Sequence, residues 1–350
     1  MFQTTTGKMQ FWLYRLSTVL KSLKTLYTLP QEKIDAFLAS YEIYDHDWVN
    51  EDELIEKMGA NYYQAIQKKL VDYYSVLNHL CSVGQVEKMY IPPTMNLSMN
   101  IIANQTLYER KMCRDLEIQP NNQVLDIGCG RGRIANHVAS FTGAHVTGIN
   151  IDPSQLESAR RFAKGTGRDH QCSFKLADLN QLPLPFPDHS FDALYQVQVF
   201  SYAKNLGALC KELYRVLKPG GKIACLDWVR LKNYCPDNPE HVRLMRQIKP
   251  LIGAIGTPSV EEYEKAFKQA GFEVTISENA SIDGLQAPLI EHADKFFNRM
   301  AKLIHFLVRW KLLPKHFKVL FDRLTQDGQA FVEADRQRLV TTSYYIVAKK

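Results

Sequence analysis

From Gln123 onward, short apolar runs of strand length alternate with stretches of helical periodicity, and this alternation constrains the fold more than any other feature. The runs are QVLDI, HVTGI, CSFKLA, FDALYQVQ and GKIACLDWV. Such alternation is typical of a parallel sheet covered by helices on both faces. Two later runs, FEVTISE and SYYIVAK, also have strand character, and the second alternates as an antiparallel partner of the first would. We therefore predict an α/β fold with a doubly wound, seven-stranded, mostly parallel sheet.

The rest of the chain is predominantly helical in pattern. We predict a helical N-terminal extension over residues 1–100, a core over 101–282, a helical insertion over 283–340 and the last strand of the sheet over 341–350. The insertion is rich in Phe, Leu, Lys and Arg. Because the last strand follows the insertion, we expect loss of the tail to damage the core sheet.

Composition excludes several classes of protein. The chain has 43 basic and 37 acidic residues, a net charge of +6, which is too mild an excess to indicate nucleic-acid binding. Its seven cysteines are scattered singly, without the spacing of a zinc site, which indicates a reducing compartment and no metal. The first apolar segment is interrupted by Arg15, Lys21 and Lys24, unlike a signal peptide. No run is long and uncharged enough to span a bilayer.

The stretch VLDIGCGRG places three glycines directly after the first strand. Gly128 and Gly130 allow the backbone to turn tightly and to approach a ligand, and the N-terminus of the following helix faces that ligand. The spacing G-x-G-x-G differs from the dinucleotide pattern G-x-G-x-x-G. Asp126, just before the first glycine, suits a cationic ammonium group better than a pyrophosphate.

The ends of the next two strands carry further polar groups. Asn150 ends the second strand, with Asp152 and Gln155 close by, where open α/β sheets often hold a ribose. After the third strand, Asp178 could accept a hydrogen bond from an adenine amine, and the Leu179 amide could contact the ring. Each residue alone could be an ordinary loop acid or helix cap. Together, an ammonium site, a ribose site and an adenine site in this order indicate S-adenosylmethionine.

Three segments resemble the motifs of class I S-adenosylmethionine-dependent methyltransferases: VLDIGCGRG, ADLNQLPLPFPDHSFD and LYRVLKPGGKIACLDWV. The resemblance covers about residues 123–229 and implies a Rossmann-like fold. It implies that Asp126, Gly128 and Gly130 contact the methionine part of the cofactor and that Asp178 reads the adenine.

From about Ile102 onward the chain more closely resembles the sterol 24-C-methyltransferases. The segments DWVRLKNYCPDNPEH and GFEVTISEN, and the approach sequence QTLYERKMCRDLEIQPNNQ, carry this resemblance. It implies an enzyme that methylates a carbon of a sterol side-chain alkene or a related isoprenoid lipid. The chain departs from the family in two places. EKMYIPPTMN stands where the family has an aromatic, glycine-rich segment, and Gln198 and Tyr202 replace an acid and a histidine.

Alkene methylation leaves a carbocation, which needs aromatic faces to stabilise it and a base to remove a proton. Asp227, near the end of the fifth strand, and Tyr202 are our candidates for the catalytic groups, although Asp227 could equally cap or pair. The predicted substrate pocket also includes other side chains, for each of which core packing is the alternative: Tyr90, Tyr195, Gln198, Phe200 and Trp228.

Basic amphipathic segments occur near both ends of the chain, at about residues 11–29 and 300–321. Such segments can lie on an anionic membrane surface, and the alternative is a helix packed on its own domain. Surface contact would give access to a water-insoluble substrate. We expect a cytoplasmic location, at the endoplasmic reticulum membrane if these segments bind lipid. The oligomeric state is left open.

Two other functions stay open at this stage. The acceptor could be an amine, a phenol or a fatty-acyl alkene of another small metabolite, or the chain could bind the cofactor without catalysis. The intact pattern at Asp126, Gly128, Gly130 and Asp178 argues against the second. A nucleic-acid methyltransferase is disfavoured, since no Asn-Pro-Pro-Tyr loop and no dense basic cluster occur in the core.

Overall fold

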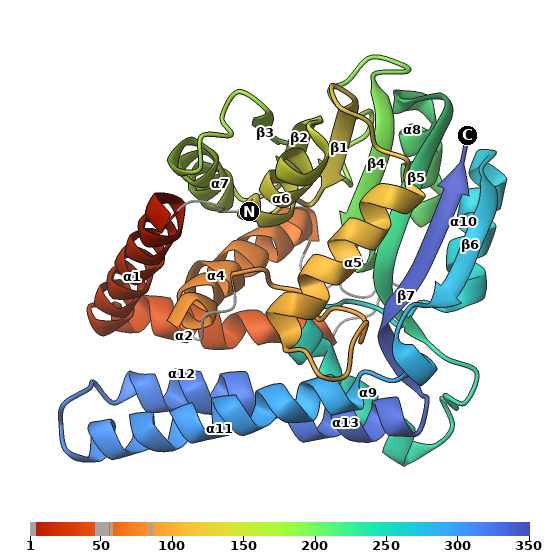
Figure 1. Cartoon of the computed structure of the whole chain (residues 1–350). Coiled ribbons are helices and arrows are strands. Elements are labelled where there is room, and N and C mark those ends of the chain that lie inside the picture. Colours follow the sequence, from red (N-terminus) through yellow and green to blue (C-terminus); the bar gives the residue numbers. More distant parts are fainter. Residues whose placement is uncertain (1–4, 46–55, 57–58, 84–86) are drawn as a thin grey trace.

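The computed structural model describes residues 5–45, 56, 59–83 and 87–350, with only the backbone of residues 5–15, 60 and 63 (Figure 1). Its seven strands form one sheet in the order β3-β2-β1-β4-β5-β7-β6. β1 to β5 run parallel, whereas β7 is antiparallel to both β5 and β6. The strands are β1 (Gln123–Ile127), β2 (His145–Asn150), β3 (Cys172–Leu176), β4 (Phe191–Val197), β5 (Leu217–Arg230), β6 (Glu273–Asn279) and β7 (Val340–Lys349). The predicted doubly wound, mostly parallel sheet is confirmed.

Helices cover both faces of the sheet (Figure 1). One face packs against α5, α6 and α7 around a core that includes Tyr108, Val138 and Ala159. The other face packs against α8 and α10 around Leu213 and Phe267. These five helices are α5 (Ile101–Asp115), α6 (Arg133–Thr142), α7 (Pro153–Gly165), α8 (Leu206–Val216) and α10 (Val260–Ala270).

The remaining helices gather beyond the carboxyl ends of the parallel strands (Figure 1). Leu26 and Phe37 from the start of the chain share an apolar core with Phe317, Leu320 and Phe321 from the insertion. The N-terminal helices and the insertion are therefore packed on each other. The N-terminal helices are α1 (Thr5–Tyr27), α2 (Gln31–Ser40), η1 (Tyr41–Asp45), η3 (Gly59–Asn61) and α4 (Tyr62–Val83). The helices of the insertion are α11 (Ala287–Arg309), α12 (His316–Thr325) and α13 (Gly328–Arg336), and α9 (Pro239–Ile252) follows β5.

Local sequence explains where the helices near the strand ends begin. Asp152 accepts hydrogen bonds from the backbone of Ser154 and Gln155, and Pro153 occupies the first turn, so α7 starts directly after β2. Gly132, in the left-handed region with φ +68°, starts α6 after β1. Among the described helices, none combines the length and the apolar character needed to cross a bilayer.

The last strand lies inside the sheet, although it comes from the end of the chain. β7 is hydrogen-bonded to β5 on one side and to β6 on the other, and its residues Tyr345, Ile346, Val347 and Ala348 are buried. The helices α11, α12 and α13 precede it, between β6 and β7. The tail therefore contributes directly to the central core.

Replacing Val347 with alanine tests this contribution. Val347 is 1% exposed, and the change removes two methyl groups worth about 0.8 kcal/mol each and leaves a cavity. We expect the free energy of unfolding, measured in urea, to fall by about 2 kcal/mol. Val319→Ala is the matched control because Val319 on α12 is 45% exposed. Equal effects of the two substitutions would contradict a central position of β7.

Candidate active site

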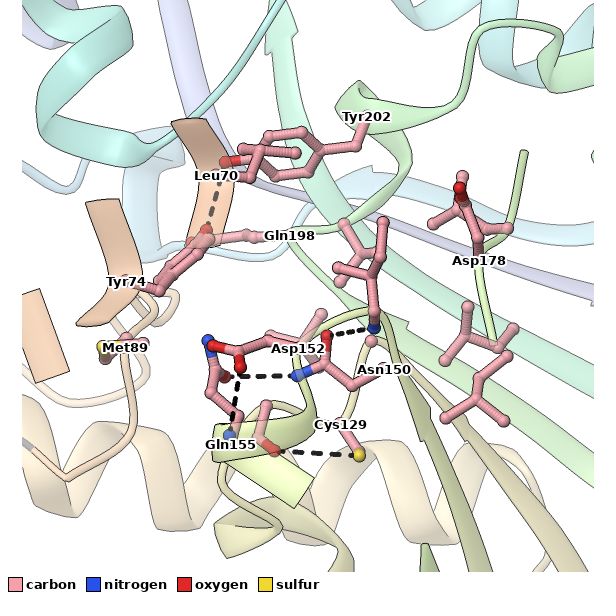
Figure 2. Close-up of a pocket in the computed structure, with 18 of the residues that line it drawn as sticks. Leu70, Tyr74, Met89, Cys129, Asn150, Asp152, Gln155, Asp178, Gln198 and Tyr202 are labelled. Atoms are coloured by element: carbon pink, nitrogen blue, oxygen red, sulfur yellow. Dashed lines mark hydrogen bonds between the residues drawn. The ribbon is translucent and has the colours of Figure 1, made fainter. Parts of the chain in front are cut away.

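A cavity of about 460 Å³ lies beyond the carboxyl ends of β1, β2 and β4 and is covered by α4 (Figure 2). Its volume is in the range of small-molecule sites. Figure 2 shows Asn150, Asp152 and Gln155 together, with Leu70, Tyr74 and Tyr202 across from them. The lining combines the glycine loop, polar groups after β2 and β3, and apolar side chains of α4, among them Ile66, Leu70, Val71, Gly128, Gly130, Asn150, Asp152, Gln155, Asp178 and Leu179.

The glycine loop forms the floor of the cavity. Gly128 and Gly130 line it and have φ of +72° and +51°, a conformation that other residues rarely adopt. A Cβ atom at Gly128 would lie 2.4 Å from Val199 Cγ2. Any larger residue here would push the loop out of place. The two predicted glycines therefore line the cavity, and their contact with a ligand stays a prediction.

Asp126 lies beneath the loop and not at the cavity surface. It is 2% exposed, it is absent from the lining, and burial raises the pKa of its carboxyl to about 7. The predicted direct contact with an ammonium group is therefore not present in this geometry. The reason is its place within β1, where successive side chains point to opposite faces of the sheet, so that its carboxyl lies under α6, near the Ala135 backbone.

Asn150, the predicted ribose residue, lines the cavity, and so does its neighbour Asp152. Asp152 Oδ1 caps α7, accepting from the Ser154 backbone N–H at 2.8 Å. Its Oδ2 is buried and has no hydrogen-bond partner among the described residues, yet Asp152 lines the cavity. A buried carboxylate oxygen without a donor is costly unless a ligand supplies one. Asn150 and Gln155 lie beside it and bond to each other at 3.2 Å.

At the end of β3, Asp178 and Leu179 both line the cavity. Asp178 Oδ2 accepts a hydrogen bond of 2.9 Å from Gln67 Nε2 of α4. The predicted adenine site is thus linked to the N-terminal helices. No motif in the sequence pointed to Gln67, because the contact joins residues more than a hundred positions apart.

Tyr202 and Gln198 line the cavity near α4, as predicted. The Tyr202 hydroxyl donates to the Gly253 carbonyl and lies 3.1 Å from the Tyr74 hydroxyl. Burial raises the pKa of Tyr202 well above its usual value, so it remains a neutral phenol. Both ends of the Gln198 amide bond to the backbone of Ile91. Gln198 therefore holds Ile91 in place. Tyr202 is no base, because its hydroxyl is bonded to a carbonyl that cannot take its proton.

Four other residues were predicted to face the substrate but do not line the cavity, so these predictions are wrong: Tyr195, Phe200, Asp227 and Trp228. Asp227 is buried and accepts hydrogen bonds from the backbone N–H groups of Phe200 and Trp228 at 2.9 and 2.8 Å. Burial raises the pKa of the Asp227 carboxyl to about 6. It fixes the loop after β4 to β5 and reaches no substrate space. Tyr195, Phe200 and Trp228 are core residues instead. Tyr90 does line the cavity.

Among the described residues, no group of three or more His, Cys, Asp or Glu side chains is arranged to hold a metal ion. The polar end of the cavity instead offers backbone amides and carboxylate oxygens. This set of groups suits the amino acid, ribose and adenine parts of S-adenosylmethionine.

Comparison with known proteins decides the family. A family model described as "Methyltransferase domain" matches residues 125–225. The sterol 24-C-methyltransferase erg6 of Aspergillus fumigatus is 30% identical, over 89% of this chain and 88% of that protein. The chain belongs to the sterol 24-C-methyltransferase family. It is a methyltransferase that uses S-adenosylmethionine as methyl donor.

The chain is also similar to two other proteins. The botryococcene C-methyltransferase of Botryococcus braunii is 38% identical over 51% of this chain and 47% of that protein. The crystal structure of the [4+2]-cyclase SpnF has a TM-score of 0.65 and 18% sequence identity, covering 81% of this chain and 96% of that one. At this identity the second similarity shows the fold alone, because one fold hosts many reactions.

When bound, S-adenosylmethionine supplies a methyl group on a positively charged sulfur. In this methyltransferase, Gly128 and Gly130 would hold its methionine part, Asp152 Oδ2 would accept from its ribose, and Asp178 and Leu179 would contact its adenine. Met89 and Leu70 also line the cavity (Figure 2).

Asp152→Asn tests the ribose contact. Asparagine caps helices as well as aspartate does, so α7 should stay intact while the charge at the second oxygen is lost. A charge-assisted hydrogen bond contributes about 1.5–3 kcal/mol. We therefore expect the Kd of S-adenosylhomocysteine, measured by titration calorimetry, to rise about 10- to 100-fold. Asp169→Asn on the exposed surface is the control. An unchanged Kd for Asp152→Asn would rule out this contact.

Proposed function

We propose that this methyltransferase adds a methyl group to an alkene carbon in the side chain of a sterol or a related isoprenoid lipid. The observation that carries the proposal is the apolar wall that α4 presents to the glycine loop. Ile66, Leu70 and Val71 line the cavity from α4, and Met89 and Ile255 extend this surface. Such a wall suits a hydrocarbon chain and offers little to a small polar acceptor. Two relatives are named as sterol and botryococcene methyltransferases, and these names support the same class of acceptor.

The proposed reaction is an in-line attack. The π electrons of the alkene form a bond to the methyl carbon, the bond between that carbon and sulfur breaks, and a positive charge is left on a substrate carbon. The enzyme's task is to align the two reactants and to stabilise the cation. Tyr74, Tyr90 and Tyr202 line the cavity, and burial raises the pKa of each above its usual value. Neutral phenol rings offer π faces to a cation.

The acceptor is tested with radiolabelled S-adenosylmethionine and separate acceptors: a Δ24-sterol, a saturated sterol, and a panel of amines and phenols. We expect label in the Δ24-sterol only. Leu70→Trp, which fills the α4 wall, should raise KM for the sterol at least tenfold while leaving the Kd of S-adenosylhomocysteine unchanged. Leu97→Trp is the control, because Leu97 is 62% exposed and lies outside both the cavity lining and α11. Label only in amines or phenols would overturn the proposed acceptor.

We further propose that the enzyme docks on the cytoplasmic surface of the endoplasmic reticulum membrane to collect its water-insoluble acceptor. The end of α11 and the following turn expose Leu303, Phe306, Trp310 and Leu312, with Trp310 65% exposed. Basic residues surround these apolar side chains, namely Lys302, Arg309, Lys311, Lys315 and Lys318. Exposed apolar groups with basic neighbours suit an anionic lipid surface.

The start of the chain extends this surface. α1 exposes Leu16 and Leu20 beside Lys21 and Lys24. It lies next to the insertion, since His316 Nε2 is 2.7 Å from the Leu26 carbonyl oxygen. Figure 1 shows α1 and the turn between α11 and α12 at the same end of the molecule. We infer that the exposed side chains of α1 and of the end of α11 contribute to one docking surface.

Sedimentation with vesicles tests the docking surface. We expect binding to vesicles containing anionic lipid and weaker binding to neutral ones. Phe306→Ser should weaken binding about tenfold or more, because burying a Phe side chain contributes about 1.5–3 kcal/mol. Phe141→Ser, an exposed Phe on α6 away from this surface, should bind as the wild type does. Equal binding by both variants would remove Phe306 from the contact.

A further inference from the structure

A buried ionic cluster lies directly behind one wall of the cavity. Glu109 of α5 has a side chain that is 0% exposed. Its Oε1 accepts from Lys88 Nζ at 2.6 Å and from the Tyr90 hydroxyl at 2.8 Å, and its Oε2 is paired with Nδ1 of His137 from α6. Lys88 and Tyr90 line the cavity, whereas Glu109 and His137 do not. The His137 side chain is 11% exposed, so the cluster runs from the cavity toward solvent.

The charges in this cluster favour an ionised acid. Burial opposes a charge on Glu109, but the neighbouring Lys88 ammonium and the hydrogen bond with His137 lower the pKa of Glu109 below its usual value. Burial and the nearby Glu109 carboxylate raise the pKa of Tyr90 well above its usual value. Tyr90 therefore keeps its proton at rest and can only take up a second proton as it passes its own to Glu109.

Neutral hydrogen bonds also hold this part of the cavity wall. Gln105 Nε2 donates to the backbone carbonyls of Lys88 and Tyr90 at 3.1 and 3.0 Å, and Gln198 binds the backbone of Ile91 on the other side. Neutral amides thus already fix this segment. Burying an ionic cluster costs free energy that a well-packed apolar cluster would not, which leaves its charge to be explained by function.

Other carboxylates that line the cavity are engaged elsewhere. Asp152 and Asp178 belong to the cofactor side, and Glu87 pairs with Arg133 at 2.9 Å. Tyr202 donates its proton to a carbonyl. Among the described residues, Glu109 is the acid that reaches the cavity through a proton-carrying side chain.

We propose that Tyr90, Glu109 and His137 carry the proton released at the end of C-methylation from the cavity to solvent. The proposal rests on the proposed function, because an alkene acceptor leaves a carbocation that must lose a proton from carbon to give the methylated alkene. Tyr90 touches the cavity and is the catalytic residue. Glu109 and His137 act through it and are positioning residues.

The proposed step conserves atoms and charge. A C–H bond next to the cationic carbon breaks, and its electron pair becomes the new C=C bond. The proton bonds to the Tyr90 oxygen as the Tyr90 O–H proton moves to Glu109 Oε1. Glu109 is then neutral. The His137 imidazolium, whose Nδ1–H donates to Glu109 Oε2, releases its Nε2 proton to solvent, so one proton enters the cluster and one leaves it. Because the carboxylate stands behind Tyr90, it cannot capture the cation as an ester.

The test is the product formed from a Δ24-sterol by three variants: Tyr90→Phe, Glu109→Gln and His137→Asn. Without the relay, water should trap the cation, so the methylated alcohol should replace the methylated alkene, and alkene formation should fall about 100-fold. The Kd of S-adenosylhomocysteine should not change. His137→Asn is the sharpest variant, since it keeps a donor to Glu109, cannot carry a proton and lies outside the cavity lining.

Tyr108→Phe is the matched control. Tyr108 packs edge-on against Tyr90 with ring centroids 6.3 Å apart, and its buried hydroxyl has no hydrogen-bond partner among the described residues. This variant should keep the wild-type ratio of alkene to alcohol. If Glu109→Gln fails to fold, Tyr90→Phe and His137→Asn decide the test, because both leave the Lys88–Glu109 pair intact.

The outcomes separate the two proposals. Wild-type enzyme that methylates no alkene overturns the proposed function and the relay with it. Wild-type enzyme that forms the methylated alkene, with Tyr90→Phe and His137→Asn giving the same product ratio and rate, overturns the relay and leaves the proposed function standing.

Discussion

The apolar contact between the N-terminal helices and the insertion is the interaction on which the site depends. Leu26 and Phe37 would be exposed on a free N-terminal extension, as would Phe317 and Leu320 on a free insertion, and their shared core removes all four from water. That core also holds α4, since Tyr73 and Leu80 belong to it. The wall that faces the glycine loop therefore exists only because residues almost three hundred positions apart pack together.

This arrangement divides the cavity by polarity. The strand ends supply amides and carboxylate oxygens, because the parallel sheet brings its carboxyl ends to one edge. α4 supplies hydrocarbon, with Leu70 facing Asn150 and Asp152 across the cavity (Figure 2). A charged cofactor and an apolar acceptor can thus meet at the boundary without either entering the environment that suits the other. Neutral tyrosines stand at that boundary, where a substrate cation would form.

Much of the fold could be predicted from local patterns. The strand runs, the glycine loop and the polar groups after β2 and β3 each depend on a few neighbouring residues, so periodicity and turn chemistry were sufficient. The orientation of a single strand residue was not predictable in this way. Asp126 and Asp227 both lie inside strands near the site, and only the packed sheet shows that each points into the protein.

Contacts between distant segments could not be predicted from the sequence, for a different reason. Gln67 bonding to Asp178, and Lys88 and His137 converging on Glu109, join elements whose relative placement depends on the whole fold. Short motifs carry no information about such pairs. Asp152 combines both cases. An Asp-Pro pair before a helix is typical of an N-cap, so this role can be predicted from the sequence. Only the packed structure shows that its second oxygen is buried without a hydrogen-bond partner among the described residues.

The structure shows what the chain has at the two places where it departs from the family pattern, the segment EKMYIPPTMN and the residues Gln198 and Tyr202. The resemblance implies an acid and a histidine after β4, where this chain has Gln198 and Tyr202. Both are occupied here with neutral hydrogen bonds to backbone, so the loop after β4 has no group able to accept a proton. An acid and a histidine nevertheless occur together at Glu109 and His137, behind the wall formed by residues 87–91. The chain buries this pair at a cost that apolar packing would avoid, while Gln198 and Tyr202 offer no group to accept a proton. The proposed proton acceptor therefore lies in the neighbouring wall, where Gln198 bonds to the backbone of Ile91.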